Sequence, residues 1–87
     1  MAKFMIEMPH NSDQCQEVLG EMATEVAPLL KEAWWGCMDG NHTGWVTVDA
    51  SSKDEALMKI PEQRRGEVKV TEVKQFSAED LKMSHAA

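Results

Sequence analysis

The stretch WWGCMDGNHTGWVTVDA, residues 34–50, decides the fold because it has the pattern of a β-hairpin. Two runs of mostly apolar residues, 33–38 and 45–50, flank the turn-forming letters DGNHTG. Such an arrangement is typical of two antiparallel strands joined by a short loop. In the second run, aliphatic side chains alternate with polar or aromatic ones. This period of two predicts a strand with one aliphatic face. We expect that face, with Val46, Val48 and Ala50, to pack against helices.

The length of the hairpin loop determines which side chains share a face of the sheet. An even-length loop with Cys37 opposite Val46 and Trp35 opposite Val48 sends Trp35 and Cys37 into the core beneath the helices. The opposite, helix-free face then carries Trp34, Met38 and Trp45. An odd-length loop with a bulge would reverse the assignment of the second strand. The even version predicts an apolar patch, which is typical of an interface or ligand site, unless Leu81 and Met83 fold back over it.

The segments before the hairpin predict a strand and a long helix. Residues 3–8, KFMIEM, alternate with period two and predict a strand. Over residues 13–33 the apolar positions follow steps of three and four, which predicts one helix with a continuous apolar stripe. Pro28 lies inside this stripe and removes a backbone donor, so we expect a kink or a break there.

The segments after the hairpin predict a short helix and a last strand. Residues 51–60, SSKDEALMKI, open with the capping-box spacing of Ser52 and Glu55. Residues 66–76 predict the fourth strand, but its apolar phase slips between Val70 and Val73, which indicates a bulge or an early strand end. Residues 77–87 are expected to form a partly helical or frayed tail of a single domain that spans residues 1–87.

The order of elements is therefore β-α-β-β-α-β, which predicts an α+β, ferredoxin-like fold. Right-handed crossovers place both helices on one face of a four-stranded antiparallel sheet. The other face is left for a partner or a ligand.

Composition excludes some classes of function. Fifteen acidic and nine basic residues give a net charge of −6, which argues against nucleic acid and anionic membrane surfaces as partners. The basic pair Arg64-Arg65 is expected in a solvated turn. No apolar run approaches the length of a membrane span, and two cysteines are too few for a disulfide framework. We expect a cytoplasmic protein with reduced thiols.

Histidine and cysteine recur at mirrored spacings, His10-x4-Cys15 and Cys37-x4-His42. The end of the first strand, the start of the first helix and the hairpin loop meet at one edge of the predicted sheet, so His10, Cys15, Asp39 and His42 can approach one another. Imidazole, thiolate and carboxylate suit zinc, nickel or copper. The alternative is that the cysteines are small core residues, which leaves His10 and His42 as the candidate metal ligands.

The candidates for acid–base catalysis are the pair His42 and Asp39 and, on the helix-free face, Glu7. His42 and Asp39 lie in the same loop and would be a general base and its orienting acid. Nothing in the sequence marks a nucleophile or an oxyanion hole, so whether the protein is an enzyme stays open.

The hairpin WWGCMDGNHTGWVTVDA, followed by SSKDEA, resembles the dimeric α+β-barrel superfamily of ferredoxin-like proteins, and most of all its short single-domain members, which include a nickel-binding group. The resemblance implies a homodimer through the helix-free sheet face and a small-ligand-binding or interaction module. Two alternatives are a cofactor-independent oxygenase or isomerase of the same fold and a transition-metal (nickel or zinc) binding protein. Fold alone does not transfer any of these functions.

Overall fold

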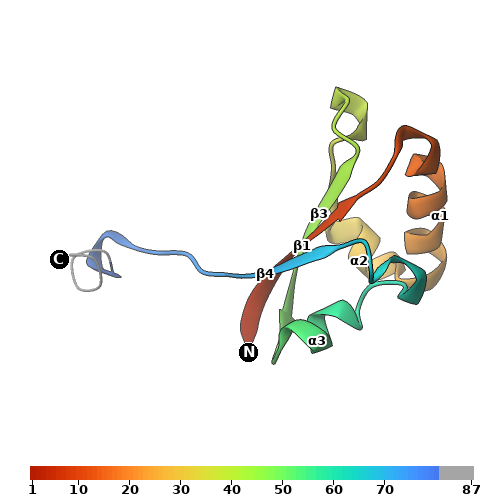
Figure 1. Ribbon diagram of the computed structural model, residues 1–87. Helices are drawn as coiled ribbons and strands as arrows, with labels where there is room; N and C mark the ends of the chain where they lie inside the picture. Colours follow the sequence, from red (N-terminus) through yellow and green to blue (C-terminus); the bar gives the residue numbers. More distant parts are fainter. Residues whose placement is uncertain (81–87) are drawn as a thin grey trace.

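A four-stranded antiparallel sheet with helices, an α+β architecture, is the framework of the protein (Figure 1). The computed structural model describes residues 1–80. The two long strands, β1 (Ala2–Pro9) and β3 (Thr43–Ala50), lie at the centre, and β2 (Trp34–Trp35) and β4 (Lys69–Val73) lie at the edges in the order β2-β3-β1-β4. The central pair β1–β3 therefore carries most of the sheet's pairing.

The predicted alternation of β1 and β3 is confirmed. Their helix-facing side chains are buried, namely Phe4, Ile6, Met8, Val46, Val48 and Ala50. The two sets are in register, with Phe4 opposite Val48 and Ile6 opposite Val46. Because residues directly opposite one another share a face, both aliphatic rows point into the same core.

The long helix predicted over 13–33 is broken in two. The structure has α1 (Cys15–Glu25) and α2 (Ala27–Glu32), separated by Val26, whose backbone is not helical (φ −141°, ψ 52°). Pro28 lies in the first turn of α2, where its missing N–H would have no intrahelical partner in any case. The region predicted as one helix therefore forms two.

The third helix, α3 (Lys53–Leu57), begins as its sequence predicts. The Ser52 hydroxyl accepts a hydrogen bond from the Glu55 N–H at 3.1 Å. Val18 and Met22 of α1 and Ala56 of α3 join the buried residues of β1 and β3 in one core. The helices that build this core therefore cover the same face of the sheet, and Figure 1 shows α1 and α2 side by side there.

The strand predicted over 33–38 is wrong beyond Trp35. Cys37–Asp39 form a 3-10 turn, η2, and Trp35 lies opposite Gly44 instead of Val48. The Gly36 carbonyl accepts hydrogen bonds from the N–H groups of Asp39 and Asn41, both at 3.0 Å, which curls the chain out of the strand. The assignment of side chains to faces survives this shift of register, because Trp34 now lies opposite Trp45, a residue of the same predicted face.

The sequence predicts either a bulge or an early end in the fourth strand, and the strand ends early. β4 pairs with β1 from Lys69 opposite Glu7 to Val73 opposite Lys3. The chain then runs away from the sheet toward residue 80 (Figure 1). Leu81 and Met83, expected as a possible cover for the helix-free face, lie outside the described residues.

The expected solvated turn at Arg64-Arg65 is wrong. Arg64, the last residue of the 3-10 helix η3 (Glu62–Arg64), is only 8% exposed and forms ion pairs with Glu17, Glu21 and Glu67. The neighbouring Arg65 side chain donates hydrogen bonds to three backbone carbonyls at the end of α3. Both guanidinium groups are thus committed to the fold.

Candidate metal centre

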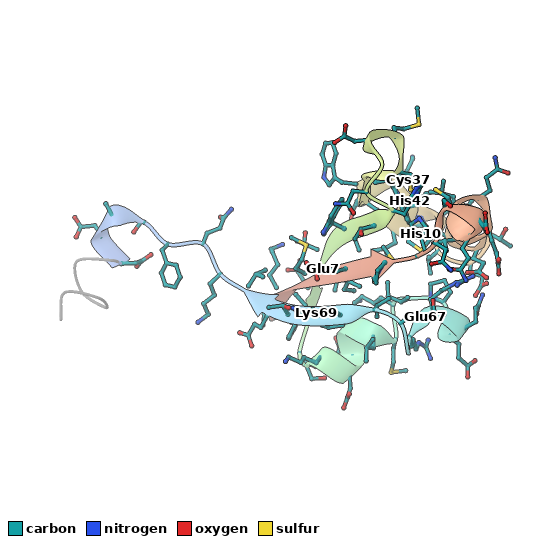
Figure 2. The ribbon with its side chains drawn as sticks, turned by 45° about the horizontal axis from the view of Figure 1, so that its top comes forward. Glu7, His10, Cys37, His42, Glu67 and Lys69 are labelled. Carbon is teal, nitrogen blue, oxygen red and sulfur yellow. The ribbon has the colours of Figure 1, made fainter. Side chains whose placement is uncertain are left out.

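Four side chains that can bind a metal ion converge where β1 ends and the β2–β3 hairpin turns. They are His10, Cys15, Cys37 and His42, and one ligand atom from each lies within 4.8 Å of the others. All four are half-buried. Figure 2 shows His10, Cys37 and His42 gathered at this end of the molecule. The four come from two segments that are far apart in the sequence, residues 10–15 and 37–42.

The register of the two central strands brings the histidines together. Pro9 lies opposite Thr43 at the end of the β1–β3 ladder, and the His10 N–H extends this ladder by donating to the His42 carbonyl at 2.9 Å. The two imidazole rings lie edge to face with their centroids 6.0 Å apart. The proximity of His10 and His42 is therefore fixed by backbone pairing.

A tight turn carries Cys37 back toward this pair. The Gly36 N–H donates to the Thr43 carbonyl at 3.0 Å, which closes the hairpin below η2. A Cβ at Gly36 would lie 2.6 Å from the Asn41 carbonyl oxygen, a separation that no side chain tolerates. Gly40, with φ +84°, ends η2 in the left-handed conformation that glycine adopts without strain. The glycines of this loop therefore shape the ligand-bearing turn.

Cys15 reaches the site from the other segment. A 3-10 turn, η1 (Ser12–Gln14), leads from β1 into α1, and Asn11 and Gln14 form a capping box at its start. The Asn11 N–H donates to the Gln14 side-chain oxygen at 3.1 Å. Cys15 is the first residue of α1, so the turn that starts the helix also positions its thiol.

The hydrogen bonds of His10 orient one ring nitrogen toward the cluster. Its Nδ1–H donates to the Met8 carbonyl at 3.2 Å, and its Nε2 accepts from the Cys37 thiol at 3.2 Å. A backbone carbonyl on one nitrogen is the usual partner of a metal-binding histidine, because it fixes the tautomer and the ring orientation. His10 thus presents the lone pair of Nε2 to the site.

The two thiols are in direct contact. The Cys15 Sγ donates to the Cys37 Sγ over 2.7 Å, and both cysteines are free. Burial raises the pKa of the Cys37 thiol, and the hydrogen bond from Cys15 raises it further. A bound cation would act in the opposite direction, because a coordinated thiol is deprotonated. The thiol pair is therefore a latent pair of thiolate ligands.

Two buried nitrogens at the site have no hydrogen-bond partner within the described chain. They are His42 Nδ1 and Trp35 Nε1, and the Trp35 ring lies 6.1 Å from the His10 ring. Buried polar atoms are almost always paired, so an unpaired one needs a specific explanation. The unpaired Nδ1 of His42 belongs to a residue of the cluster and is therefore available as a metal ligand.

Sequence reasoning identified this end of the molecule but not the complete site. His10 and His42 were the predicted metal ligands and are both members of the cluster. For Cys15 the sequence leaves two roles open, a member of this candidate site or a small core residue, and it favours the core for Cys37; the structure groups both cysteines with the two histidines. The mirrored x4 spacing was the signal for the full set. The spacing alone does not identify the four ligands, because the predicted strand points the Cys37 side chain toward the helices.

The predicted acid–base partner is not part of this cluster. Asp39 lies in η2, is exposed and does not belong to the group of four. His42 therefore has two thiols and an imidazole as its chemical neighbours, and an enzyme that uses the His42–Asp39 pair stays a prediction.

The residues predicted for the helix-free face separate into two places. Trp34 and Trp45 lie opposite one another, and Trp34 is 78% exposed. Met38 lies in η2 at the tip of the hairpin and is fully exposed, so it is not on the sheet. A hollow of about 150 Å³ beside the tryptophans is lined by Met5, Glu32, Trp34, Trp45, Val46 and Thr47. The patch on the sheet is thus smaller than the sequence predicted.

Within residues 1–80, none of the helices combines the length and the apolar character that a membrane crossing requires. Comparison of the chain with protein-family models, with curated proteins and with solved structures gave no match.

Proposed function

We propose that this protein binds a transition-metal ion of the zinc class through His10, Cys15, Cys37 and His42. The observation that carries the proposal is the convergence of two thiols and two imidazoles, with their ligand atoms within 4.8 Å of one another. Two cysteines and two histidines form one of the common ligand sets of four-coordinate zinc.

The spacing of the ligand atoms supports binding without refolding. Zinc bonds of about 2.0–2.3 Å place the atoms of a tetrahedral site about 3.3–3.8 Å apart. The contact of His10 Nε2 with Cys37 Sγ is 3.2 Å, already close to this range. The two sulfurs, at 2.7 Å, would have to separate by about 1 Å to reach it, which is within reach of side-chain rotation.

The ligand set also supports a structural role for the metal. Four protein ligands fill a tetrahedral coordination sphere, and such closed sites hold structure instead of activating water. The ion would connect the β1–α1 turn to the tip of the β2–β3 hairpin, two segments that the backbone hydrogen bond from His10 N–H to the His42 carbonyl already brings together. The metal is therefore proposed as a clamp on the hairpin.

Metal titration of the reduced protein tests this function. Cobalt(II) added to the thiol-reduced, chelator-treated protein is expected to give thiolate-to-cobalt charge-transfer bands and intense tetrahedral visible bands, and zinc should displace it. Native mass spectrometry with zinc, nickel and copper identifies which ion binds one to one. Absence of stoichiometric binding by any of these ions under reducing conditions would overturn the proposal.

Two variants locate the site. Cys37→Ser removes one ligand, and metal affinity is expected to fall at least about 100-fold, because even outer partners of metal ligands contribute 10–100-fold. Asp39→Asn, two residues away in the same turn and exposed, is the matched control and should leave affinity unchanged. Equal loss in both variants would place the ion elsewhere.

A homodimer with the ferredoxin-like topology and a small-ligand pocket is a second proposal. It is supported by the exposed Trp34 beside Trp45 on the face of the sheet opposite the helix-packed core. Exposed apolar patches of this kind are typical of interfaces. Light scattering on the wild-type protein and on Trp34→Glu tests it, since a monomer at high concentration in both would exclude a dimer through this face.

A further inference from the structure

The contact between Cys15 and Cys37 places the two thiols of the proposed metal site where they can also form a disulfide. The two sulfurs are 2.7 Å apart, and the side chains are half-buried instead of enclosed. They are the only two cysteines of the sequence, so neither has a competing thiol within the chain. Proximity of two partly accessible thiols is the condition for rapid disulfide formation.

We propose that Cys15 and Cys37 form a peroxide-sensitive switch that releases the bound metal by closing into a disulfide. This inference rests on the proposed metal binding and concerns its regulation. The same two sulfurs serve both states. As thiolates they are ligands, and as a disulfide they are neutral and no longer available as charged ligands.

The reaction balances with a hydroperoxide as the oxidant. One thiolate attacks a peroxide oxygen, the O–O bond breaks, and a sulfenic acid forms with release of hydroxide, which is protonated to water. The second thiolate attacks that sulfur, the S–S bond forms, the S–O bond breaks, and hydroxide again leaves as water. In total, the two thiolates lose two electrons, one hydrogen peroxide and two protons become two waters, and the divalent metal ion is set free.

The metal-bound state and the disulfide state differ in metal content, but both connect the same two segments of the chain. Cys15 starts α1 and Cys37 starts η2, so a disulfide would link the same two segments that the metal ion is proposed to link. The remaining ligands, His10 and His42, would be two imidazoles without any thiolate beside them. The switch is therefore expected to change metal occupancy while the fold is kept.

The test follows metal and thiols in one sample. The reduced protein is loaded with one equivalent of zinc, freed of reductant and treated with hydrogen peroxide in the presence of a chromogenic zinc chelator. We expect release of one equivalent of zinc at the same rate as the loss of two alkylatable thiols. The intact mass should fall by two hydrogen atoms, and dithiothreitol followed by zinc should restore the starting state.

Two variants separate the disulfide from metal binding. His42→Asn keeps both thiols and is expected to bind zinc poorly but to form the same disulfide under peroxide. Cys15→Ser cannot form it, so Cys37 should instead gain oxygen atoms in the mass spectrum. The Asp39→Asn control should behave as the wild-type protein in both assays.

The possible failures are distinguishable. If zinc is bound before peroxide is added and then stays bound, or leaves only with gain of sulfinic oxygen, the switch is wrong and metal binding stands. If no zinc is bound by the reduced protein before peroxide is added, the proposed function fails, and the switch fails with it.

Discussion

Two clusters of polar side chains connect α1 to distant parts of the chain, and they differ in where the positive charge comes from. In the first, the Arg64 guanidinium lies among Glu17, Glu21 and Glu67, with N–O distances of 2.9, 2.6 and 3.2 Å. In the second, His10, Cys15, Cys37 and His42 gather atoms that bind metal cations. The first cluster contains its own cation, and we propose that the second binds one.

The difference appears in the hydrogen bonding of each cluster. The Arg64 Nε, Nη1 and Nη2 atoms all donate to carboxylates, and the side chain is only 10% exposed. Near the second cluster, His42 Nδ1 and Trp35 Nε1 are buried without a partner in the described chain. A cluster completed by the chain should stabilise the fold with or without added metal, whereas one that needs a metal should do so only when the metal is supplied.

The largest expected effect tests this conditional stability. Zinc at about a thousand times its Kd should stabilise the reduced protein by about 4 kcal/mol, because the ion binds only the folded site. Urea unfolding with zinc and with a chelator measures the difference. In Cys37→Ser, whose affinity is expected to fall at least about 100-fold, the same zinc concentration should stabilise by no more than about 1.4 kcal/mol, and a zinc effect as large as that of the wild-type protein would contradict the assigned ligands.

Removal of the built-in cation is expected to have the next largest effect. Arg64→Met leaves the largely buried Glu21 carboxylate without its partner and should cost about 3 kcal/mol in the free energy of unfolding. Metal affinity should not change. The matched control is Lys3→Met, since the Lys3–Asp49 pair has side chains 54% and 61% exposed and such surface pairs contribute less than about 1 kcal/mol. Equal losses in the two variants would show that the Arg64 cluster is an ordinary surface network.

The hairpin turn gives a smaller effect that connects backbone shape to metal binding. Gly36→Ala places a Cβ 2.6 Å from the Asn41 carbonyl oxygen and should cost about 2 kcal/mol, as overpacking usually does. It should also weaken cobalt binding, because η2 carries Cys37. Gly20→Ala in α1, where a Cβ meets nothing within 4 Å, should instead stabilise by about 0.5–1 kcal/mol and leave binding unchanged. Undisturbed cobalt spectra in Gly36→Ala would mean that the turn does not set the ligand geometry.

The smallest expected effect is a pH dependence of the Arg64 cluster. The hydrogen bond from Arg64 lowers the pKa of Glu21 below its ordinary value of 4.5. A lowered folded-state pKa means that the contribution of Glu21 to stability is complete above about pH 4.5 and is lost as the pH falls through the folded pKa.

Urea unfolding in the presence of a chelator checks this dependence on the wild-type protein and Arg64→Met. The difference between the two free energies should stay constant from pH 7 to about pH 5 and should narrow below about pH 4.5. A difference that stays constant down to pH 3 would show that Glu21 does not titrate with the cluster.

Local patterns in the sequence predicted the strands and helices that their own side chains define. The alternation of Phe4, Ile6 and Met8 and that of Val46, Val48 and Ala50 gave the correct core faces. Ser52 predicted the start of α3 and Pro28 predicted the break before α2. Each of these features depends on neighbours within about one helical turn or on a period of two, so a single sequence contains the necessary information.

The hairpin could not be predicted to the same degree. Its register depends on where the chain leaves the strand, and Gly36 decides this through carbonyl contacts with Asp39 and Asn41. The predicted register placed Cys37 in a strand and hence in the core. The observed turn moves it to the side of His10, where its Sγ lies 3.2 Å from Nε2.

By itself, the sequence determined which chemical groups are present, their mirrored spacing, and the α+β framework of strands and helices. Only the tertiary structure decided that His10, Cys15, Cys37 and His42 meet, and that Arg64 is buried instead of solvated. The physical reason is that both clusters join segments more than twenty residues apart. Their geometry depends on the β1–β3 register and on the packing of α1, which local periodicity does not specify.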